Sequence, residues 1–182
     1  GEVLTASDVN TYLVNNGYQY AGTRYYTSSG TFEKADPLGT GDIGLRAIRV
    51  RMVGGGGGGA GAATATRSGG GGGGGGYSEI FFTDLASMDA SVAVTRGAGG
   101  SGGVGDASGV VGGTSVMNKT ASVELLRATG GDPGLLYTDG SGGQGGVGSL
   151  GDLNIEGQGG GAVGANVTAN PSGAGGSSML GG

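Results

Sequence analysis

Carboxylates are the side chains of this sequence with the widest choice of chemistry, because the chain contains neither His nor Cys. Without those two residue types no Ser–His or Cys–His nucleophile pair can form. In the C-terminal half, Asp132, Asp139, Asp152 and Glu156 are scattered rather than paired. Asp132 and Asp139 offer oxygen ligands of the kind Ca²⁺ prefers, but their spacing is not that of a known calcium loop. We therefore expect no enzyme activity, no cofactor and no metal.

A second stretch that suggests ligand binding is the glycine run Gly54–Gly59, which follows a predicted strand. Glycine-rich loops after strands often hold phosphates, but the Lys-Ser/Thr pair of a P-loop and a following helix are both absent here. The chain carries 9 basic and 14 acidic residues, a net charge of -5. Such a balance provides no basic surface for nucleic acid. Neither nucleotide nor nucleic-acid binding is expected.

The element that organises the chain is the region Gly54–Gly76, in which two glycine runs flank residues 60–68. Glycine supplies 51 of the 182 residues, whereas proline supplies only 3, so collagen is excluded. Glycine runs are usually flexible linkers. Charged residues make up only 13% of the chain, which is low for a disordered segment. The composition therefore favours a structural role for the glycines.

Strands are predicted on both sides of the glycine runs. Residues 47–53 alternate, with Ile48, Val50 and Met52 on one face and Arg49 and Arg51 on the other, which predicts a half-buried strand. β-forming residues also predict two short strands within 18–34, and further strands at 77–83, 91–96 and 120–129.

Beyond residue 97 the non-glycine residues recur at every third position. Ala98, Ser101 and Val104 are separated only by glycine, and Ser141, Gln144 and Val147 repeat the pattern. A polyproline-II-type helix of glycine has about three residues per turn and leaves two edges bare, so that neighbouring backbones can bond to each other. The fold class predicted is mostly β with polyglycine-II helices: a short N-terminal helix, a small antiparallel β part, and then stacked glycine-rich rods in a sandwich.

Turns between the predicted rods should carry the other residues, in the ranges 106–111, 131–139, 152–156 and 166–172. Asp132-Pro133-Gly134 is good turn chemistry. The residues that follow it, Leu135, Leu136 and Tyr137, are unusually apolar for a loop tip. They are either buried by packing or form a receptor-contact loop.

The N-terminal residues 4–14 predict a short amphipathic helix, with Thr5 as its N-cap and Val9, Tyr12 and Leu13 on one face. A helix this short needs a partner for its apolar face, either its own domain or another protein. We assign Val9, Tyr12 and Leu13 as the candidate docking residues, in an N-terminal attachment segment 1–25 that precedes a glycine-rich domain at 26–182. The sequence contains no apolar stretch long enough to span a membrane, so we expect neither a membrane span nor an export signal.

The glycine-rich part resembles the glycine-rich domain of bacteriophage tail proteins, from about Tyr26 onward. The N-terminal residues 4–13 resemble a segment found near the start of phage virion proteins. The matching stretches, in order, are 27–32, 47–59, 76–79, 91–100, 113–115 and 128–131. The chain departs from the family at Arg96, where a valine commonly stands, and in having few aromatic residues in its distal loops.

The resemblance implies a virion structural protein at a tail tip or tail fibre, commonly named a minor tail protein, with an adhesin role toward a host receptor. Its expected partners are other virion proteins, a host-surface receptor and further copies of itself, since fibres are usually trimers. Its expected location is the virion, assembled in the host cytoplasm. One alternative is a capsid decoration or head-fibre protein that does not bind the host. Another is an ice-binding protein, which the mixed residues at the period-three positions disfavour.

Overall fold

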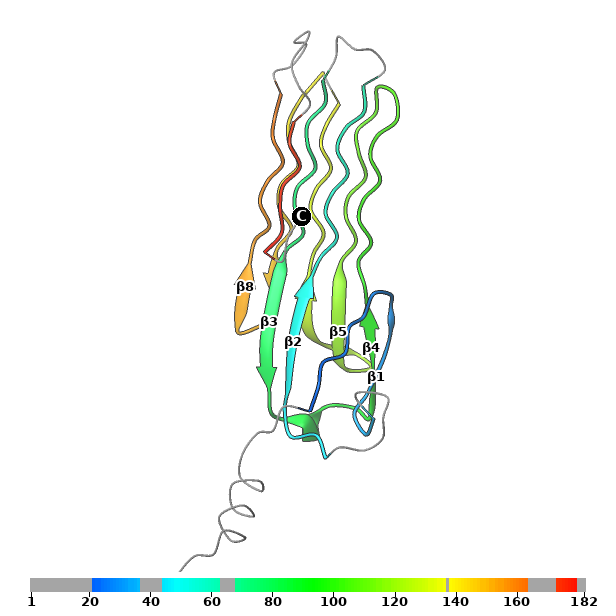
Figure 1. Cartoon of the computed structure of the whole chain (residues 1–182), viewed down its shortest axis with the longest axis vertical. Helices are drawn as coiled ribbons and strands as arrows, with labels where there is room; N and C mark the ends of the chain where they lie inside the picture. The colour runs from blue at the N-terminus through cyan, green and yellow to red at the C-terminus, as the bar shows by residue number, and fades with distance from the viewer. Residues whose placement is uncertain (1–20, 37–43, 63–67, 137, 164–172, 180–182) are drawn as a thin grey trace, which may run out of the picture.

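The strand hairpin that brackets the two glycine runs lies at the centre of the fold. In the computed structural model, which describes residues 21–36, 44–62, 68–136, 138–163 and 173–179, β2 (Ile48–Val53) pairs antiparallel with β3 (Tyr77–Phe82) (Figure 1). Met52 is buried whereas Arg49 and Arg51 are exposed, so the predicted alternation of this strand is confirmed.

The strands form two antiparallel sheets. One has three strands in the order β2-β3-β8, and the other has five in the order β1-β4-β5-β6-β7. The remaining strands are β1 (Gly30–Glu33), β4 (Ser91–Thr95), β5 (Ser115–Thr120), β6 (Val123–Ala128), β7 (Gly148–Ser149) and β8 (Leu153–Ile155). In the described part of 18–34, where two strands are expected, β1 is the only strand. The sequence does not predict β5, β7 or β8, and β8 lies within 152–156, where a turn is expected.

A hydrophobic core fills the space between the two sheets. Leu126 and Ala128 of β6 are fully buried and lie among side chains from both sheets and from the short 3-10 turn η1 (Leu85–Ser87). The other buried members of the core are Phe32, Met52, Leu85, Met88, Val92, Val94, Met117 and Leu125. The inward-facing apolar residues of the strands therefore hold the two sheets together.

The strands continue into glycine-rich segments that run side by side along the long axis of the molecule (Figure 1). These segments carry neither helix nor strand assignment. We call them together the glycine lattice, which comprises residues 54–62, 68–76, 97–104, 107–114, 129–136, 140–147, 156–163 and 173–179.

Backbone hydrogen bonds join the segments at intervals of three residues. Within 54–62, the N–H groups of Gly54, Gly57 and Ala60 donate to segment 68–76, over 2.8 to 2.9 Å. The N–H groups one residue further on, at Gly55, Gly58 and Gly61, donate to segment 107–114, over 2.9 Å. One segment therefore bonds to different neighbours along different edges, and buried backbone polar groups find partners without side chains.

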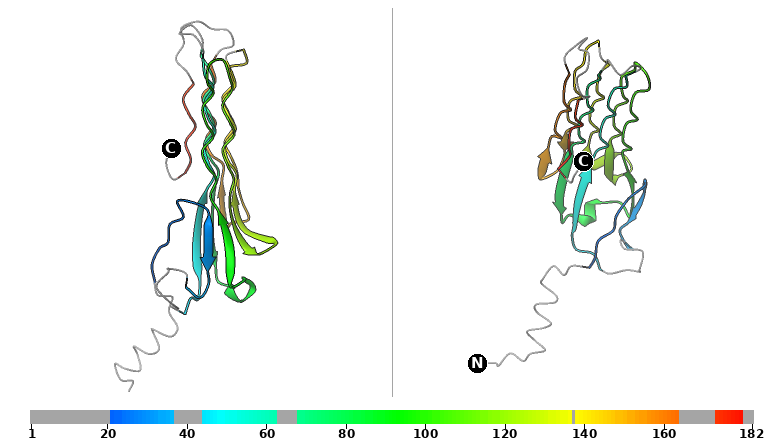
Figure 2. Two further views of the ribbon diagram at one scale, coloured as in Figure 1. Left: turned by 90° about the vertical axis from the view of Figure 1, so that its right-hand side faces the viewer. Right: turned by 45° about the horizontal axis from the view of Figure 1, so that its top comes forward.

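Two layers account for most of these bonds. Segments 97–104, 54–62, 68–76 and 156–163 follow one another in the first layer, and segments 107–114, 129–136 and 140–147 form the second. Segment 173–179 lies outside both, on the first layer, and the left view of Figure 2 shows it apart from the two columns.

Close packing explains the second glycine run. All residues from Gly69 to Gly76 are buried. A Cβ atom at Gly73 would lie 1.9 Å from the carbonyl oxygen of Gln144, and one at Gly75 would lie 1.9 Å from that of Gly54. No real side chain fits such a distance, so glycine is required there by the approach of a neighbouring backbone.

The predicted fold class is wrong. The regular structure of the described residues is all-β, in two antiparallel sheets, and its helical content is the three-residue turn η1. Polyglycine-II helices are not shown, because the glycine-rich segments have no helix assignment. The expected N-terminal helix falls within 1–20, outside the described residues. The period of three predicts a helix, but in the structure it coincides with exposure to solvent. The residues at these positions are all exposed: Ala98, Ser101, Val104, Ser141, Gln144 and Val147.

Candidate functional site

The turns at the end of the lattice away from the sheets form the first candidate site, which we call the distal end (Figure 1). One turn joins segments 97–104 and 107–114, and the other joins 129–136 and 140–147. Gly105 and Gly140 adopt φ angles of +62° and +70°, which glycine accommodates without strain. Val104 beside the first turn is 89% exposed. The distal end thus presents turn residues on a closely bonded support.

The proposed receptor-contact residues lie at the start of the second turn. The backbone of Leu135 is bonded on both sides, since its N–H donates to Ser141 and its carbonyl accepts from Gly70. The N–H of Leu136 donates to the Ser108 hydroxyl, over 3.2 Å. Leu135 and Leu136 are half-buried, and Tyr137 is outside the described residues. Leu135 therefore belongs to the lattice, and Leu136 begins the turn.

The carboxylates do not converge on one site. The Asp139 carboxylate accepts hydrogen bonds from the N–H and hydroxyl of Ser141 within the distal turn. The Asp152 carboxylate accepts from the Phe81 N–H, over 2.9 Å, in the connection between β7 and β8, at the other end of segment 140–147. The described residues contain no group of three or more acidic side chains that could hold a metal ion. Asp132 and Asp139 therefore gain no third acidic ligand among these residues.

The first glycine run does not form a phosphate loop. Most of its N–H groups already donate to backbone carbonyls, so they do not point into an open cradle. The donors are Gly54, Gly55, Gly57 and Gly58, and their acceptors are Gly76, Gly113, Gly73 and Val110. The run serves packing between segments.

The candidate docking residues Val9, Tyr12 and Leu13 lie outside the described residues, so their role and the division at residue 25 stay predictions. Across the part of the chain that is described, no helix has the length and apolar character needed to cross a membrane.

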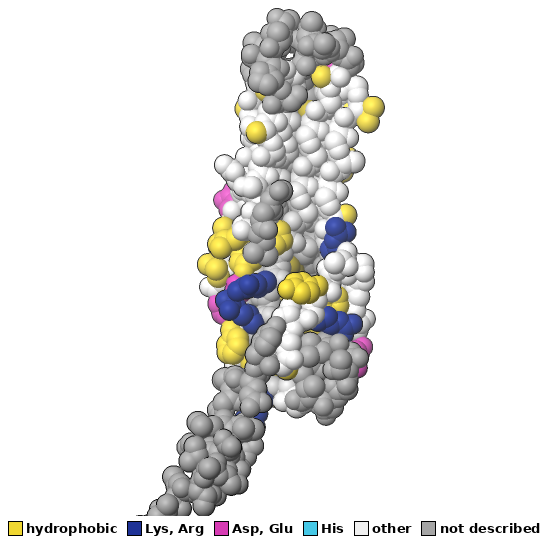
Figure 3. Space-filling model, in the orientation of Figure 1, with side chains coloured by type: hydrophobic (Ala, Val, Ile, Leu, Met, Phe, Trp, Pro, Cys, Tyr) yellow, Lys and Arg dark blue, Asp and Glu magenta, His cyan; other side chains and the backbone are white. Residues whose placement is uncertain are grey.

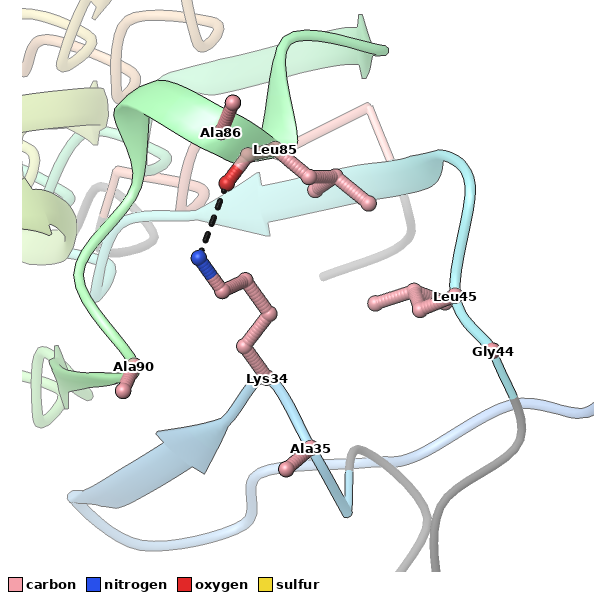
Figure 4. A pocket seen from close by; sticks show the side chains of 7 residues that line it. All are labelled: Lys34, Ala35, Gly44, Leu45, Leu85, Ala86 and Ala90. Carbon is pink, nitrogen blue, oxygen red and sulfur yellow. Dashed lines mark hydrogen bonds between the residues drawn. The ribbon is translucent and has the colours of Figure 1, made fainter.

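A hollow lies at the sheet end, beside η1 (Figure 4). Lys34 reaches across it and donates from Nζ to the carbonyl oxygens of Leu85 and Met88, over 3.0 and 2.7 Å. The other lining residues are Ala35, Gly44, Leu45, Leu85, Ala86 and Ala90. The ammonium group of Lys34 is thus bonded to backbone carbonyls, and the other described lining residues are apolar or glycine.

A charged network covers the outer face of the three-stranded sheet. Glu79 of β3 accepts a hydrogen bond from the Tyr77 hydroxyl and pairs with Arg49 and Arg51 of β2, the second over 3.2 Å. The hydrogen bond from Tyr77 and then that from Arg49 hold the pKa of Glu79 below its usual value. Burial raises the pKa of Tyr77, and its bond to Glu79 adds to the rise. Glu79 thus stays charged at neutral pH.

This network escaped the sequence analysis. Glu79 stands opposite Arg51 only once the register of β2 and β3 is known, and no local sequence pattern gives that register. Exposed Phe81 and Leu153 lie on the same sheet. In Figure 3 basic side chains gather over the strands, while the lattice beyond them is almost wholly white.

Comparison with protein families identifies the main part of the chain. Residues 27–182 match the model of the glycine-rich domain. The chain belongs to the glycine-rich domain family. This match covers both sheets and the whole glycine lattice. No curated protein and no solved structure matches the chain.

Proposed function

We propose that this glycine-rich domain protein is a structural protein of the bacteriophage virion, located at the tail tip or tail fibre, with an adhesin role toward the host surface. The resemblance of residues 4–13 and of the glycine-rich part to phage virion proteins suggests the setting. The single observation that supports the role best is the division of the molecule into a sheet end and a distal end of turns on a backbone-bonded body.

The body suits a part that works outside a cell. Its segments are held by backbone bonds with little use of charged side chains, so the lattice depends weakly on ionic strength. Residues 69–76 at the centre are buried glycines, so they offer a protease no exposed side chain to bind. Such a body keeps the distal turns in fixed positions.

The proposed partners follow from the two ends of the molecule. The N-terminal segment would dock to other virion proteins through Val9, Tyr12 and Leu13, and the distal end would contact a host receptor near Leu135, Leu136 and Tyr137. Assembly would take place in the host cytoplasm. No catalytic step is part of this function.

Adsorption competition tests the adhesin role. Purified full-length chain is added to a panel of bacterial strains before phage, and free phage is counted over time. We expect the protein to slow adsorption of at least one phage. The distal variant Val104→Asp, at a side chain 89% exposed, should lose this effect.

Val123→Asp is the matched control, because Val123 is also an exposed valine, 51% exposed, but begins β6 at the sheet end. It should compete as well as the original chain. If purified protein never slows adsorption, and C-terminal labels appear on heads in electron micrographs, the capsid decoration or head-fibre role is correct instead.

A further inference from the structure

One face of the first lattice layer is bare of side chains. Gly56 and Gly59 of segment 54–62 lie beside Gly99 and Gly102 of segment 97–104, since the carbonyls of Gly56 and Gly59 accept hydrogen bonds from Gly100 and Gly103. Gly56, Gly99 and Gly102 are exposed and Gly59 is half-buried. We call these four residues the bare face.

Among the described residues, no neighbouring atom requires glycine at these four positions. A Cβ atom would lie 3.7 Å from its nearest neighbour at Gly56 and at Gly59, 3.9 Å at Gly99 and 3.6 Å at Gly102, which is ordinary van der Waals contact. Glycine costs about 0.5–1 kcal/mol relative to alanine through backbone entropy. Other exposed positions of the lattice, such as Ala98 and Ser101, do carry side chains. Glycine without an internal clash points to the close approach of another backbone.

The bare face also presents unpaired donors. Within the described residues, the N–H groups of Gly56, Gly59, Gly99 and Gly102 donate no hydrogen bond. In the described segment 97–104 the N–H groups of Ala98 and Ser101 donate none either, whereas those of Gly100 and Gly103 donate to segment 54–62. A row of unpaired backbone groups is a template for a further chain, as at the edge of a sheet. The spacing of these donors, at every third residue, matches the spacing used throughout the lattice.

Segment 173–179 covers another part of the first layer, over segments 68–76 and 156–163. Its Gly173 and Gly176 N–H groups donate to Gly69 and Gly72, over 3.0 and 2.8 Å. Its Ala174 and Ser177 carbonyls accept from segment 156–163. At Gly175 no atom lies within 4 Å of a Cβ position, so a bare edge of this segment faces outward as well. The segment is the first member of a third layer that stops beside the bare face.

We propose that a second copy of this chain covers the bare face. Segment 173–179 of the second copy would lie on the first layer of the first copy, beside the first copy's own segment 173–179, and the reverse would hold for the second copy. The arrangement is two-fold, with the same surface used by both copies. The occupant is a second copy because this chain itself carries the matching piece, an extended segment with bonding groups at every third residue and a bare outer edge. The four glycines of the bare face bring no charge that would oppose the contact.

Sedimentation equilibrium of the full chain tests the proposal. We expect a dimer at high micromolar concentration that dissociates on dilution. Gly102→Leu should give a monomer with an unchanged unfolding temperature, since the side chain enters open space in the monomer. Ser101→Leu is the matched control, one residue away on the edge that already carries side chains, and should remain a dimer.

Two further measurements keep the result decisive if Gly102→Leu fails to fold. Gly102→Ala should raise the dissociation constant by about tenfold or more, equivalent to about 1.4 kcal/mol. Amide exchange at Gly56 and Gly59 should be slower at high protein concentration than at low concentration. A monomer at every concentration, a trimer, or dimers that tolerate Gly102→Leu would each overturn the proposal. Its failure would leave adsorption competition unaffected, so it is separable from the adhesin role.

Discussion

The sheet end and the glycine lattice are stabilised in opposite ways. In the sheets, side chains such as fully buried Leu126 fill the space between layers. In the lattice, Gly69–Gly76 are equally buried but bring no side chain at all. Neighbouring lattice segments are instead held by backbone hydrogen bonds of 2.7 to 3.1 Å. The same chain thus builds one core from apolar volume and another from backbone contact.

This difference inverts the usual effect of mutation. A well-packed core loses stability when a large side chain is made small, because a cavity remains. The lattice should lose stability when a small residue is made large, because backbones are forced apart.

The largest effect is expected from Gly73→Leu at the lattice centre. Its Cβ atom would lie 1.9 Å from the Gln144 carbonyl oxygen, so at least two segments must separate. We expect a loss of about 3 kcal/mol or more in unfolding free energy, measured by denaturant titration. Gly56→Leu is the control, because its Cβ meets only an atom 3.7 Å away. Equal damage from both variants would mean that burial in the lattice does not decide the outcome.

The sheet end should respond to the opposite change, Leu126→Ala. This side chain has 0% exposure, and its truncation leaves a cavity that we expect to cost about 2–5 kcal/mol. Leu153→Ala, at a leucine 44% exposed, should change stability by less than about 1 kcal/mol. Thermal unfolding followed by circular dichroism measures both. A neutral Leu126→Ala would show that the lattice alone supports the fold.

Limited proteolysis compares the lattice with a flexible glycine linker. A protease of broad specificity should leave residues 97–104 and 140–147 uncut under native conditions, because their backbones are bonded to neighbouring segments. Mass spectrometry of the fragments locates the cuts, and the Gly73→Leu variant serves as the unfolded-lattice control. Rapid cleavage of the original chain within these segments would contradict an ordered lattice.

The smallest effect concerns the surface network on β3. The pKa of Glu79 is lowered in the folded chain, so its stabilising contribution is present at neutral pH and is lost as pH falls through the folded pKa. Glu79→Gln should therefore lower the unfolding temperature at pH 7 and have little effect near pH 3. Glu156→Gln, at an exposed carboxylate after β8, is the control and should change neither value. If Glu79→Gln lowered the unfolding temperature as much at pH 3 as at pH 7, the effect would not come from the charge of Glu79.

Part of the fold could be predicted because strand patterns are local. The alternation of residues 47–53 predicted β2, and β-forming residues predicted β3 and β4 to within about a residue. The class of helix predicted for the glycine segments was wrong, because a period of three records exposure without fixing the backbone class. The pairing of β1 with β4 joins residues about 60 positions apart, which no local pattern reveals.

The candidate sites divide in the same way. Asp132-Pro133-Gly134 was the predicted turn within 131–139, but these residues bond to neighbouring segments as part of 129–136. The turn lies further on, where the N–H of Gly140 donates to the carbonyl of Leu136. The Glu79 network depends on cross-strand register and was missed for that reason. Whether Leu135, Leu136 and Tyr137 contact a receptor stays a prediction for the adsorption experiment.

The sequence by itself determined that the glycines are structural and that side chains at every third residue share an edge. It could not determine which glycines are indispensable, because a pure glycine run carries no phase of its own. Only the tertiary structure separated Gly73, where a Cβ atom would collide with a neighbouring carbonyl, from Gly56, where a Cβ atom would make an ordinary contact of 3.7 Å. The physical reason is that a glycine is indispensable only where neighbouring atoms leave no room for a side chain, and those atoms belong to segments far away in the chain.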